Sequence, residues 1–360
     1  MIIRIQGVSE LQNQIYYDYD TDSVPLGQGG MGVVYPGRCF KVDNSTEYIP
    51  VAIKLITNTA PDMIERAMRE ASIQIDNPNL LRMYGFIPNM EMDLYTHEMK
   101  PRYYIAMERL DGVSLETMLG GVFCAQNGVD ISYARNLYDL SLKDKKEFTL
   151  KVMKPILNGV NALHQAGYIH RDLDPSNIMI TQDDGIKIID YGVCKPLSLA
   201  YGSGKLTMTG SIIGKVDYAA PELLSGDVQH HSFTTDIYAI GIMMYRLYVG
   251  NLPFEGDNSS IMKAHLNEDV PVDKIADPLI KKIVAKATRK MQEDRYQSIG
   301  EILEVLENEN TDRHAVPSVE SEVVLENDDS IEETRASKTN YWLFAAFAGM
   351  ASGIACAFIV

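Results

Sequence analysis

Residues 170–192 read HRDLDPSNIMITQDDGIKIIDYG, and this stretch decides the fold. Two apolar runs flank the sequence QDDG at 182–185, whose turn-forming residues predict a β-hairpin. Asp172 and Asn177 lie in the loop before the hairpin, and Asp190 ends its second strand. Two acidic residues in one hairpin are ordinarily uninformative, so the spacing of Asp190 from Asp172 is what indicates a candidate site.

A glycine-rich stretch lies upstream, where residues 26–35 read LGQGGMGVVY. Gly27, Gly29 and Gly32 fit the spacing G-x-G-x-x-G, and Val34 extends it to G-x-G-x-x-G-x-V. Glycine suits a backbone that lies close over phosphates, because it has no Cβ atom. A dinucleotide-binding fold would begin a helix at the third glycine, whereas Gly32 is followed by a strand-forming sequence. The stretch therefore predicts a β-hairpin lid.

A lysine follows the glycine-rich stretch in the sequence VAIKLI, residues 51–56. Alternation along a strand puts Ala52 and Lys54 on one face, so Lys54 is expected to point into the same site. An amphipathic helix is predicted next. Glu70 on this helix is the favoured partner for Lys54 and Glu65 is the second choice, with a solvated surface position as the alternative for either glutamate.

Further motifs follow downstream in a fixed order. AlaProGlu stands at 220–222, AspIleTyrAlaIleGly at 236–241, and Arg295 lies in EDRYQS. Together with the glycine-rich stretch, VAIK, HRDLDPSN and DYG, this order resembles that of eukaryotic-like protein kinases of the serine/threonine type also found in bacteria. The resemblance covers about residues 17–306, and it implies that Arg295 pairs with Glu222.

The resemblance implies an α+β fold of the bilobal protein-kinase kind. A small β-rich N-lobe at about 17–107 would be followed by a larger helical C-lobe at about 112–306, with ATP between them. Residues 1–16 would be an N-terminal extension. The activity implied is that of a serine/threonine protein kinase, a phosphotransferase that moves the γ-phosphate of ATP to protein hydroxyls, including its own.

The resemblance also implies a role for each site residue. Asp172 would be the catalytic base, and Asn177 and Asp190 would bind Mg²⁺, or Mn²⁺ in its place. Residues 107–111 (MERLD) resemble the hinge, with Met107 as the gatekeeper. The positions implied to contact the nucleotide are Leu26, Gly27, Gly29, Gly32, Val34, Ala52, Lys54, Glu70, Met107, Glu108, Leu110 and Met179.

Two positions depart from the family pattern. Asp174 stands where these kinases usually carry a lysine that touches the γ-phosphate, and Lys215 stands where they usually carry the threonine that contacts that lysine. Since both partners of one contact have changed together, we expect a charge swap in which Lys215 pairs with Asp174 and supplies the catalytic cation. The alternative is two independent losses in a weakened enzyme.

The substrate class is read from the same loop. HRDLDPSN lacks the Ala or Arg that follows HRDL in tyrosine kinases, so serine and threonine are favoured. In the family, Arg171 often binds a phosphorylated activation loop, for which Ser203, Thr207, Thr209 and Ser211 are the acceptors to consider. Asp174 favours one alternative, a pseudokinase scaffold, while the AlaProGlu motif disfavours a small-molecule kinase. A pure membrane scaffold would leave the ordered motifs unexplained.

Composition limits the partners. The 360 residues carry a formal net charge of −16 with a sequence pI near 4.9, which argues against nucleic acid as a partner. The 4 cysteines are scattered without a C-x-x-C pair, which disfavours a zinc site and suits a reducing cytosol. The N-terminal sequence MIIRIQGVSE has no signal-peptide pattern.

The C-terminal part changes character twice. Residues 307–338 are acidic and polar, which predicts a disordered linker. Residues 341–360 then read YWLFAAFAGMASGIACAFIV without a charge, which predicts a single-pass transmembrane helix. Arg335 and Lys338 precede this segment and predict a cytoplasmic side for the kinase domain.

The predicted transmembrane segment has a face of small residues. Ala345, Gly349 and Gly353 recur four residues apart, a spacing that lets two membrane helices pack closely. The sequence therefore allows a homodimer as a weaker hypothesis, since such spacing is common by chance in segments rich in glycine and alanine.

Overall fold

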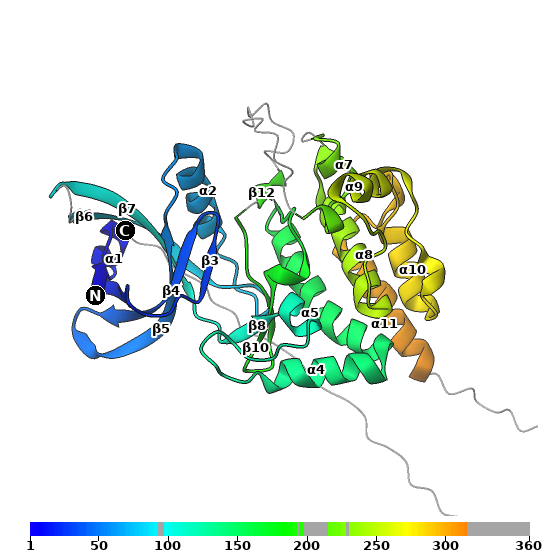
Figure 1. Ribbon diagram of the computed structural model, residues 1–360, viewed down its shortest axis with the longest axis horizontal. Coiled ribbons are helices and arrows are strands. Elements are labelled where there is room, and N and C mark those ends of the chain that lie inside the picture. The colour runs from blue at the N-terminus through cyan, green and yellow to red at the C-terminus, as the bar shows by residue number, and fades with distance from the viewer. Residues whose placement is uncertain (93–96, 193, 198–214, 228–229, 315–360) are drawn as a thin grey trace, which may run out of the picture. The chain divides into compact units, whose positions relative to one another are not determined.

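The computed structural model describes residues 1–92, 97–192, 194–197, 215–227 and 230–314. These residues form a β-rich N-lobe and a helical C-lobe joined by a short hinge segment, as Figure 1 shows. The α+β bilobal arrangement that the motifs implied is therefore present.

A seven-stranded sheet dominates the N-lobe, and its strands follow the order β1-β2-β4-β5-β7-β6, with β3 paired to β4. Every pairing in it is antiparallel. The strands are β1 (Ile2–Ile5), β2 (Ile15–Asp20), β3 (Gly27–Gly29), β4 (Gly32–Lys41), β5 (Asn44–Ile56), β6 (Met83–Met92) and β7 (Met99–Glu108).

The N-terminal extension is part of this sheet. Strand β1 pairs with β2 along its whole length, and Ile5 lies fully buried opposite Tyr17. The short helix α1 (Val8–Gln12) connects the two strands. One face of the sheet buries tyrosines and branched residues, including Ile53 and Tyr104, in a second core beside the main one. The predicted N-terminal extension thus supplies an edge strand to the sheet of the lobe.

Helix α2 (Pro61–Ser72) covers the other face of the sheet and contributes Ala67 and Ala71 to the main core. Pro61 stands at the first turn of the helix, where its missing N–H group leaves no hydrogen bond unmade. The helix thus holds Glu70 beside the strand that carries Lys54.

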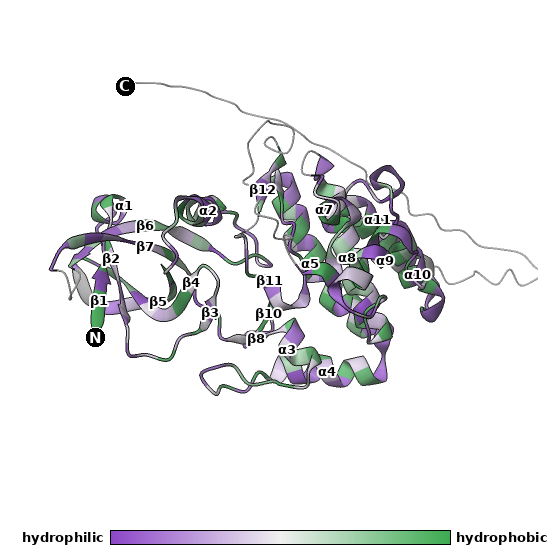
Figure 2. Cartoon of the chain, turned by 45° about the horizontal axis from the view of Figure 1, so that its top comes forward, coloured by the Kyte–Doolittle hydropathy of each residue, from purple (hydrophilic) through white to green (hydrophobic). Residues whose placement is uncertain are grey.

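Helices form most of the C-lobe, and α5 and α8 lie at its centre. Figure 2 shows that hydrophobic residues cover long stretches of both helices, and α8 is buried over most of its length. The helices are α3 (Leu115–Leu119), α4 (Ser132–Lys143), α5 (Lys145–Gln165), α7 (Pro221–Leu224), α8 (Phe233–Val249), α9 (Asn258–Asn267), α10 (Pro278–Ala287) and α11 (Ile299–His314).

Short strands and turns of 3₁₀ helix connect the helices of the C-lobe. The hairpin predicted around residues 182–185 is present, and its first strand also pairs with β8. The strands are β8 (Gly112–Ser114), β9 (Tyr168–Ile169), β10 (Ile178–Thr181), β11 (Ile186–Ile188) and β12 (Lys195–Pro196). The 3₁₀ turns are η1 (Pro175–Asn177), η2 (Val216–Tyr218), η4 (Val272–Lys274) and η5 (Gln292–Asp294).

Helix α11 corrects the predicted start of the acidic linker. The helix continues to His314, so residues 307–314 are helical where a disordered segment was expected from 307. Lys146 on α5 explains part of the difference, because its ammonium group contacts Glu309 at 2.9 Å and Asp277 at 2.6 Å. A partly buried cation therefore stabilises an acidic turn that composition alone marked as solvated.

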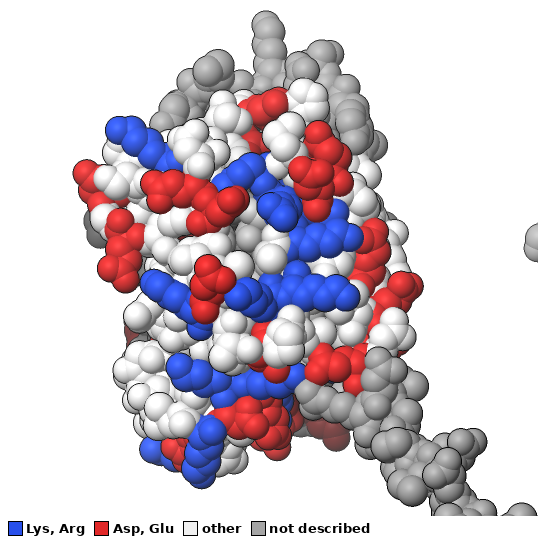
Figure 3. All heavy atoms as spheres, turned by 90° about the vertical axis from the view of Figure 1, so that its right-hand side faces the viewer, with Lys and Arg blue, Asp and Glu red and all other residues white. Residues whose placement is uncertain are grey.

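Charges of both signs alternate over the face formed by α9, α10 and α11. Figure 3 shows Lys and Arg side chains interspersed with Asp and Glu on this face. Local ion pairs account for part of the pattern, such as Lys281 with Asp273 at 2.9 Å.

The predicted transmembrane segment, residues 341–360, lies outside the described residues, as do residues 315–338 of the linker. Among the helices of the described ranges, none combines the length and the apolar character needed to cross a membrane.

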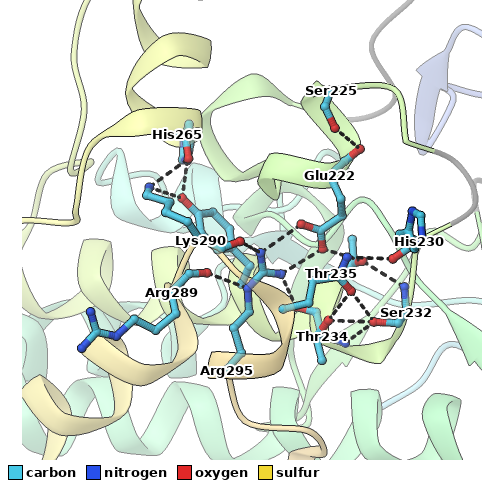
Figure 4. A network of polar contacts seen from close by, with 12 residues as sticks. Glu222, Ser225, His230, Ser232, Thr234, Thr235, His265, Arg289, Lys290 and Arg295 are labelled. Atoms are coloured by element: carbon cyan, nitrogen blue, oxygen red, sulfur yellow. Dashed lines mark hydrogen bonds and ion pairs between the residues drawn. The ribbon is translucent and has the colours of Figure 1, made fainter.

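A buried ion pair fixes the end of the activation segment to the C-lobe. The two terminal guanidinium nitrogens of Arg295 contact the Glu222 carboxylate at 2.9 Å, as the motifs implied, and the Arg295 side chain is fully buried. Thr235 donates to the same carboxylate at 2.8 Å, and Arg295 also donates to the Arg289 and Lys290 carbonyls. Figure 4 shows how this network joins α7, the start of α8 and the segment before α11.

Candidate functional site

A cavity of about 490 Å³ lies between the sheet of the N-lobe and the short strands of the C-lobe. All the residues implied to contact the nucleotide line it, and so do Asn177 and Asp190. The lining also includes residues that the motifs did not indicate, namely Gln28, Gly30, Met31, Met63, Arg66, Leu81 and Ile189.

The glycine-rich stretch forms the predicted hairpin over this cavity. Gly27 pairs with Val34, and Gly29 pairs with Gly32. A Cβ atom on Gly32 would lie 2.0 Å from the carbonyl oxygen of Leu55, so only glycine fits there. Met31 at the hairpin tip is buried against the main core, a contact that the glycine spacing could not indicate.

Lys54 pairs with Glu70, the partner that the helix pattern favoured over Glu65. The Lys54 ammonium group donates to both carboxylate oxygens of Glu70, at 2.7 and 2.9 Å. Glu65 instead pairs with Arg69 on the exposed side of α2. Burial raises the pKa of Glu70, and the nearby charge of Asp190 adds to this rise although the Lys54 charge opposes it.

The hinge lies at the end of β7, where Met107 is buried directly opposite Ala52. The Glu108 amide donates to the Arg82 carbonyl at 2.9 Å, and the Glu108 carboxylate accepts from Lys187 at 3.0 Å. The hinge is thereby held by backbone on one side and by an ion pair on the other.

Asp236 on α8 fixes the backbone of the loop that leads to Asp172. Its carboxylate accepts the backbone amides of His170 and Arg171 at 2.8 Å each, and His164 contacts it at 2.8 Å. Burial raises the pKa of Asp236, but the hydrogen bonds outweigh burial, and the net pKa lies below its usual value. Arg171 has a φ of 68°, which is uncommon outside glycine, so this carboxylate stabilises a sharp turn before Asp172.

Asp172 is not among the residues that line the cavity, but it contacts Asn177, which is. Asn177 donates to the Asp172 carbonyl at 2.9 Å and to its carboxylate at 3.3 Å. The Lys215 backbone amide also hydrogen-bonds the carboxylate. Burial raises the pKa of Asp172, and the charges of Asp174 and Asp190 act in the same direction.

Lys215 and Asp174 form the contact expected from their joint departure from the family pattern. The Lys215 ammonium group lies 2.8 Å from the Asp174 carboxylate and 3.0 Å from the Ser176 hydroxyl. The Asp174 side chain is 3% exposed, whereas that of Lys215 is 44% exposed. Asp174 also accepts the Ser176 amide at 2.7 Å and so caps the turn that carries Asn177.

Asp190 projects from the end of the hairpin toward the cavity. The Gly192 amide donates to its carboxylate at 2.7 Å, and Arg66 on α2 donates to the Gly192 carbonyl. A Cβ atom on Gly192 would lie 3.0 Å from both Arg66 and Asp190, so this close approach favours glycine. Carboxylate and amide oxygens are the ligands that Mg²⁺ prefers, and Mn²⁺ accepts the same donors, so Asp190 and Asn177 fit either ion.

Two basic residues of the C-lobe have lowered pKa values. Burial lowers the pKa of Arg171 to about 10, and burial with the charges of Arg171 and Arg69 also lowers the pKa of Lys195. The four hydroxyl residues considered as phosphate acceptors, Ser203, Thr207, Thr209 and Ser211, lie outside the described residues.

Comparisons with known proteins identify relatives over most of the chain. The family model described as "Protein kinase domain" matches residues 21–314. Serine/threonine-protein kinase PknE of Mycobacterium bovis is 30% identical over 288 residues, which cover 77% of this chain and 44% of that protein. Serine/threonine-protein kinase PrkC of Bacillus subtilis is 31% identical over 283 residues, 76% of this chain and 38% of that protein. The chain thus spans less than half the length of these relatives.

Replacing Lys54 with Met should destabilise the protein by about 3–5 kcal/mol at neutral pH, because it leaves Glu70 buried without a cation. Burial raises the pKa of Glu70, so the folded state holds that proton more tightly than the unfolded state. The loss should therefore shrink as the pH falls toward about 4.3, where the unfolded state also protonates the residue. Urea unfolding at pH 7 and pH 5 measures both effects.

Two variants control this experiment. The double variant Lys54→Met/Glu70→Leu should recover most of the stability, because no charge is left buried. Lys281→Met, which removes an exposed partner of Asp273, should change little. An equal loss at both pH values would contradict the role given to Glu70.

Proposed function

The chain belongs to the protein kinase domain family, and on this premise we propose that it transfers the γ-phosphate of ATP to serine and threonine hydroxyls of proteins. One observation carries the proposal. Lys54 with Glu70, and Asn177 with Asp190, line a single cavity, and the Asp172 carboxylate accepts a hydrogen bond from Asn177. Phosphoryl transfer needs little beyond positioning and charge neutralisation, and these groups supply both.

The proposed nucleotide site uses the two lobes differently. The glycine-rich hairpin would cover the phosphates, and Ala52 and Met179 would enclose the adenine between them. Because the Glu108 amide already donates to Arg82, adenine would use the Glu108 carbonyl together with the Leu110 backbone. Lys54, held by Glu70, would contact the α- and β-phosphates.

Asp172 is the proposed catalytic base. Its carboxylate would orient the substrate hydroxyl and accept its proton, and Asn177 would fix the position of that carboxylate. A raised pKa makes a carboxylate a stronger proton acceptor, which suits this role. A divalent ion held by Asp190 and Asn177 would neutralise charge on the phosphates.

Lys215 is the proposed source of the cation that the catalytic loop lacks. The Asp174 charge, beside Asp172, would repel a phosphate if it were left alone. The Lys215 ammonium group contacts Asp174, and its side chain remains partly exposed. We propose that it neutralises Asp174 and faces the transferred phosphate.

A second candidate function rests on Asp174. A carboxylate in this position is unfavourable for phosphate, so the chain could act as a nucleotide-binding scaffold without transfer activity. The intact Lys54, Asp172, Asn177 and Asp190 favour the enzyme. Measurement of transfer decides between the two.

A membrane anchor is proposed from the sequence alone. Residues 341–360 would cross the membrane once, residues 315–338 would form a flexible acidic linker, and the kinase domain would be cytoplasmic. The small residues Ala345, Gly349 and Gly353 support pairing of two such helices as a further part of this proposal.

Replacing Asp172 with Asn should reduce transfer of radiolabelled phosphate to a protein substrate by about 10²- to 10⁴-fold, the usual contribution of a general base. The same variant should melt at a higher temperature. Burial raises the pKa of Asp172, so its ionised form is less favourable in the folded than in the unfolded protein at neutral pH. Asp273→Asn, an exposed carboxylate far from the cavity lining, is the matched control.

The outcomes of this experiment separate the two candidate functions. Unchanged transfer in the Asp172→Asn variant would contradict the assignment of the base. A wild-type chain that binds ATP with Mg²⁺ but transfers no phosphate would favour the scaffold.

Replacing Lys215 with Ala should lower kcat by about 10²-fold with little change in the KM for ATP, as expected when one preorganised charge is removed. The double variant Asp174→Lys/Lys215→Thr returns the cation to the catalytic loop and should recover much of the activity. Lys281→Ala is the control for loss of a partly exposed lysine. Full activity in Lys215→Ala would refute the charge swap.

The membrane proposal predicts that the full chain sediments with membranes after an alkaline carbonate wash. A chain ending at residue 314 should stay in the supernatant, because it lacks the apolar segment. Release of the full chain by the wash would rule out a transmembrane anchor. Chemical crosslinking in membranes, with Gly349→Leu as the comparison, tests the proposed pairing.

A further inference from the structure

A small hairpin between α3 and α4 reaches across the two lobes. Residues 123–131 form this clasp hairpin, in which the Ala125 and Val129 backbones and the Ile131 and Phe123 backbones are hydrogen-bonded at 2.8 Å. Gly128 turns the chain with a φ of +81°. The turn chemistry of these residues is that of an ordinary loop, so their sequence carries no functional signal.

The base of the clasp hairpin is fixed to the C-lobe. Ile131 is fully buried, and the Phe123 ring packs edge-on against Tyr138 of α4 at 5.3 Å. Arg135 of α4 lies over the Phe123 ring and contacts Asp130 at 2.6 Å. These contacts make the hairpin a stiff extension of α4.

The tip of the clasp hairpin bonds the hinge segment and the N-lobe. Asn127 donates to the Asp111 carboxylate at 2.9 Å. The Gln126 side-chain amide lies against two carbonyls of the N-lobe. With its oxygen and nitrogen exchanged, the orientation that satisfies both atoms, its nitrogen donates to the Pro25 carbonyl at 2.7 Å and the Leu26 carbonyl at 2.8 Å. Figure 2 shows the loop between α3 and α4 extending toward the lower edge of the N-lobe.

The two carbonyls stand at the entry to the glycine-rich hairpin. Leu26 lines the cavity, and its amide donates to the Val34 carbonyl at 2.7 Å. The next residue, Gly27, is the first of β3 and also pairs with Val34. A contact with Pro25 and Leu26 therefore affects the glycine-rich hairpin that covers the cavity. The base of the clasp hairpin is anchored to the C-lobe, on the opposite side of the cavity.

We propose that Gln126 is a positioning residue that holds the glycine-rich hairpin closed over the bound nucleotide and slows nucleotide exchange. That the ligand is a nucleotide rests on the proposed function, whereas the hydrogen bonds of Gln126 to the N-lobe do not. Two hydrogen bonds to consecutive carbonyls fix both the position and the orientation of the backbone that enters β3, whereas a single bond would leave it free to rotate. Gln126 does not line the cavity, so it acts through the hairpin.

Stopped-flow release of a fluorescent ADP analogue from the full chain tests the proposal. The Gln126→Ala variant should release it about tenfold faster than the wild type, since two neutral hydrogen bonds are lost. Gln297→Ala is the matched control, because it removes side-chain bonds to the Gln292 and Arg295 carbonyls within one lobe. The melting temperatures of the two variants should agree.

Amide hydrogen exchange in the nucleotide-free chain supplies a readout that needs no ligand. Residues 27–34 should exchange faster in Gln126→Ala than in Gln297→Ala, while α4 stays unchanged. Equal exchange in the two variants, or release at the wild-type rate from Gln126→Ala, would contradict the positioning role proposed for Gln126. If no variant binds the analogue, the proposed function fails, and the exchange comparison still decides whether Gln126 holds the glycine-rich hairpin.

Discussion

Carboxylates gathered around one end of a cavity repel one another, and the rest of the structure depends on how this repulsion is offset. Glu70 and Asp190 line the cavity, and Asp172 and Asp174 lie beside Asn177, which also lines it. Neighbouring charges help raise the pKa of Glu70 and of Asp172. Each carboxylate has its own donor, respectively Lys54, Asn177, Lys215 and the Gly192 amide. Breaking any of these contacts would leave a buried or half-buried charge against like charges.

The donors come from segments far apart in the chain, so the fold has to bring them together accurately. Asp236 fixes the backbone ahead of Asp172 from inside the C-lobe. The Glu222–Arg295 pair fixes the end of the activation segment, just beyond Lys215. Asp236 and Glu222 are buried carboxylates that accept several hydrogen bonds, so both hold the backbone rigidly. A flexible backbone here would separate Lys215 from Asp174.

Much of the site could be predicted from the sequence, because its parts are short motifs whose spacing fixes their geometry. The glycine spacing, the strand that carries Lys54 and the hairpin that ends at Asp190 all appear where local patterns indicated. The pairing of Lys215 with Asp174 could be predicted because two departures from one pattern compensate in charge.

Other parts could not be predicted, because they depend on tertiary contacts. Residues before 17 form an edge strand through backbone bonds, and composition does not report such pairing. Residues 307–314 remain helical beside Lys146, although the same acidic composition is typical of a linker. Gln126 bonds to backbone carbonyls that any sequence would offer, so the clasp hairpin has no motif.

The distribution of these contacts between the lobes bears on how the cavity can open. Lys54 and Glu70 satisfy each other within the N-lobe, while Asp172, Asn177, Asp174 and Lys215 satisfy one another within the C-lobe. Separation of the lobes therefore leaves each of these groups of charges paired. The contacts between the lobes include Arg66 with the Gly192 carbonyl and Gln126 with the Pro25 and Leu26 carbonyls. Near the hinge they also include the ion pair of Lys187 with Glu108 and backbone bonds of Asn79 and Leu81 with Ile188. When the lobes move apart for exchange, the charged groups of either lobe can thus keep the geometry that they need when the cavity closes.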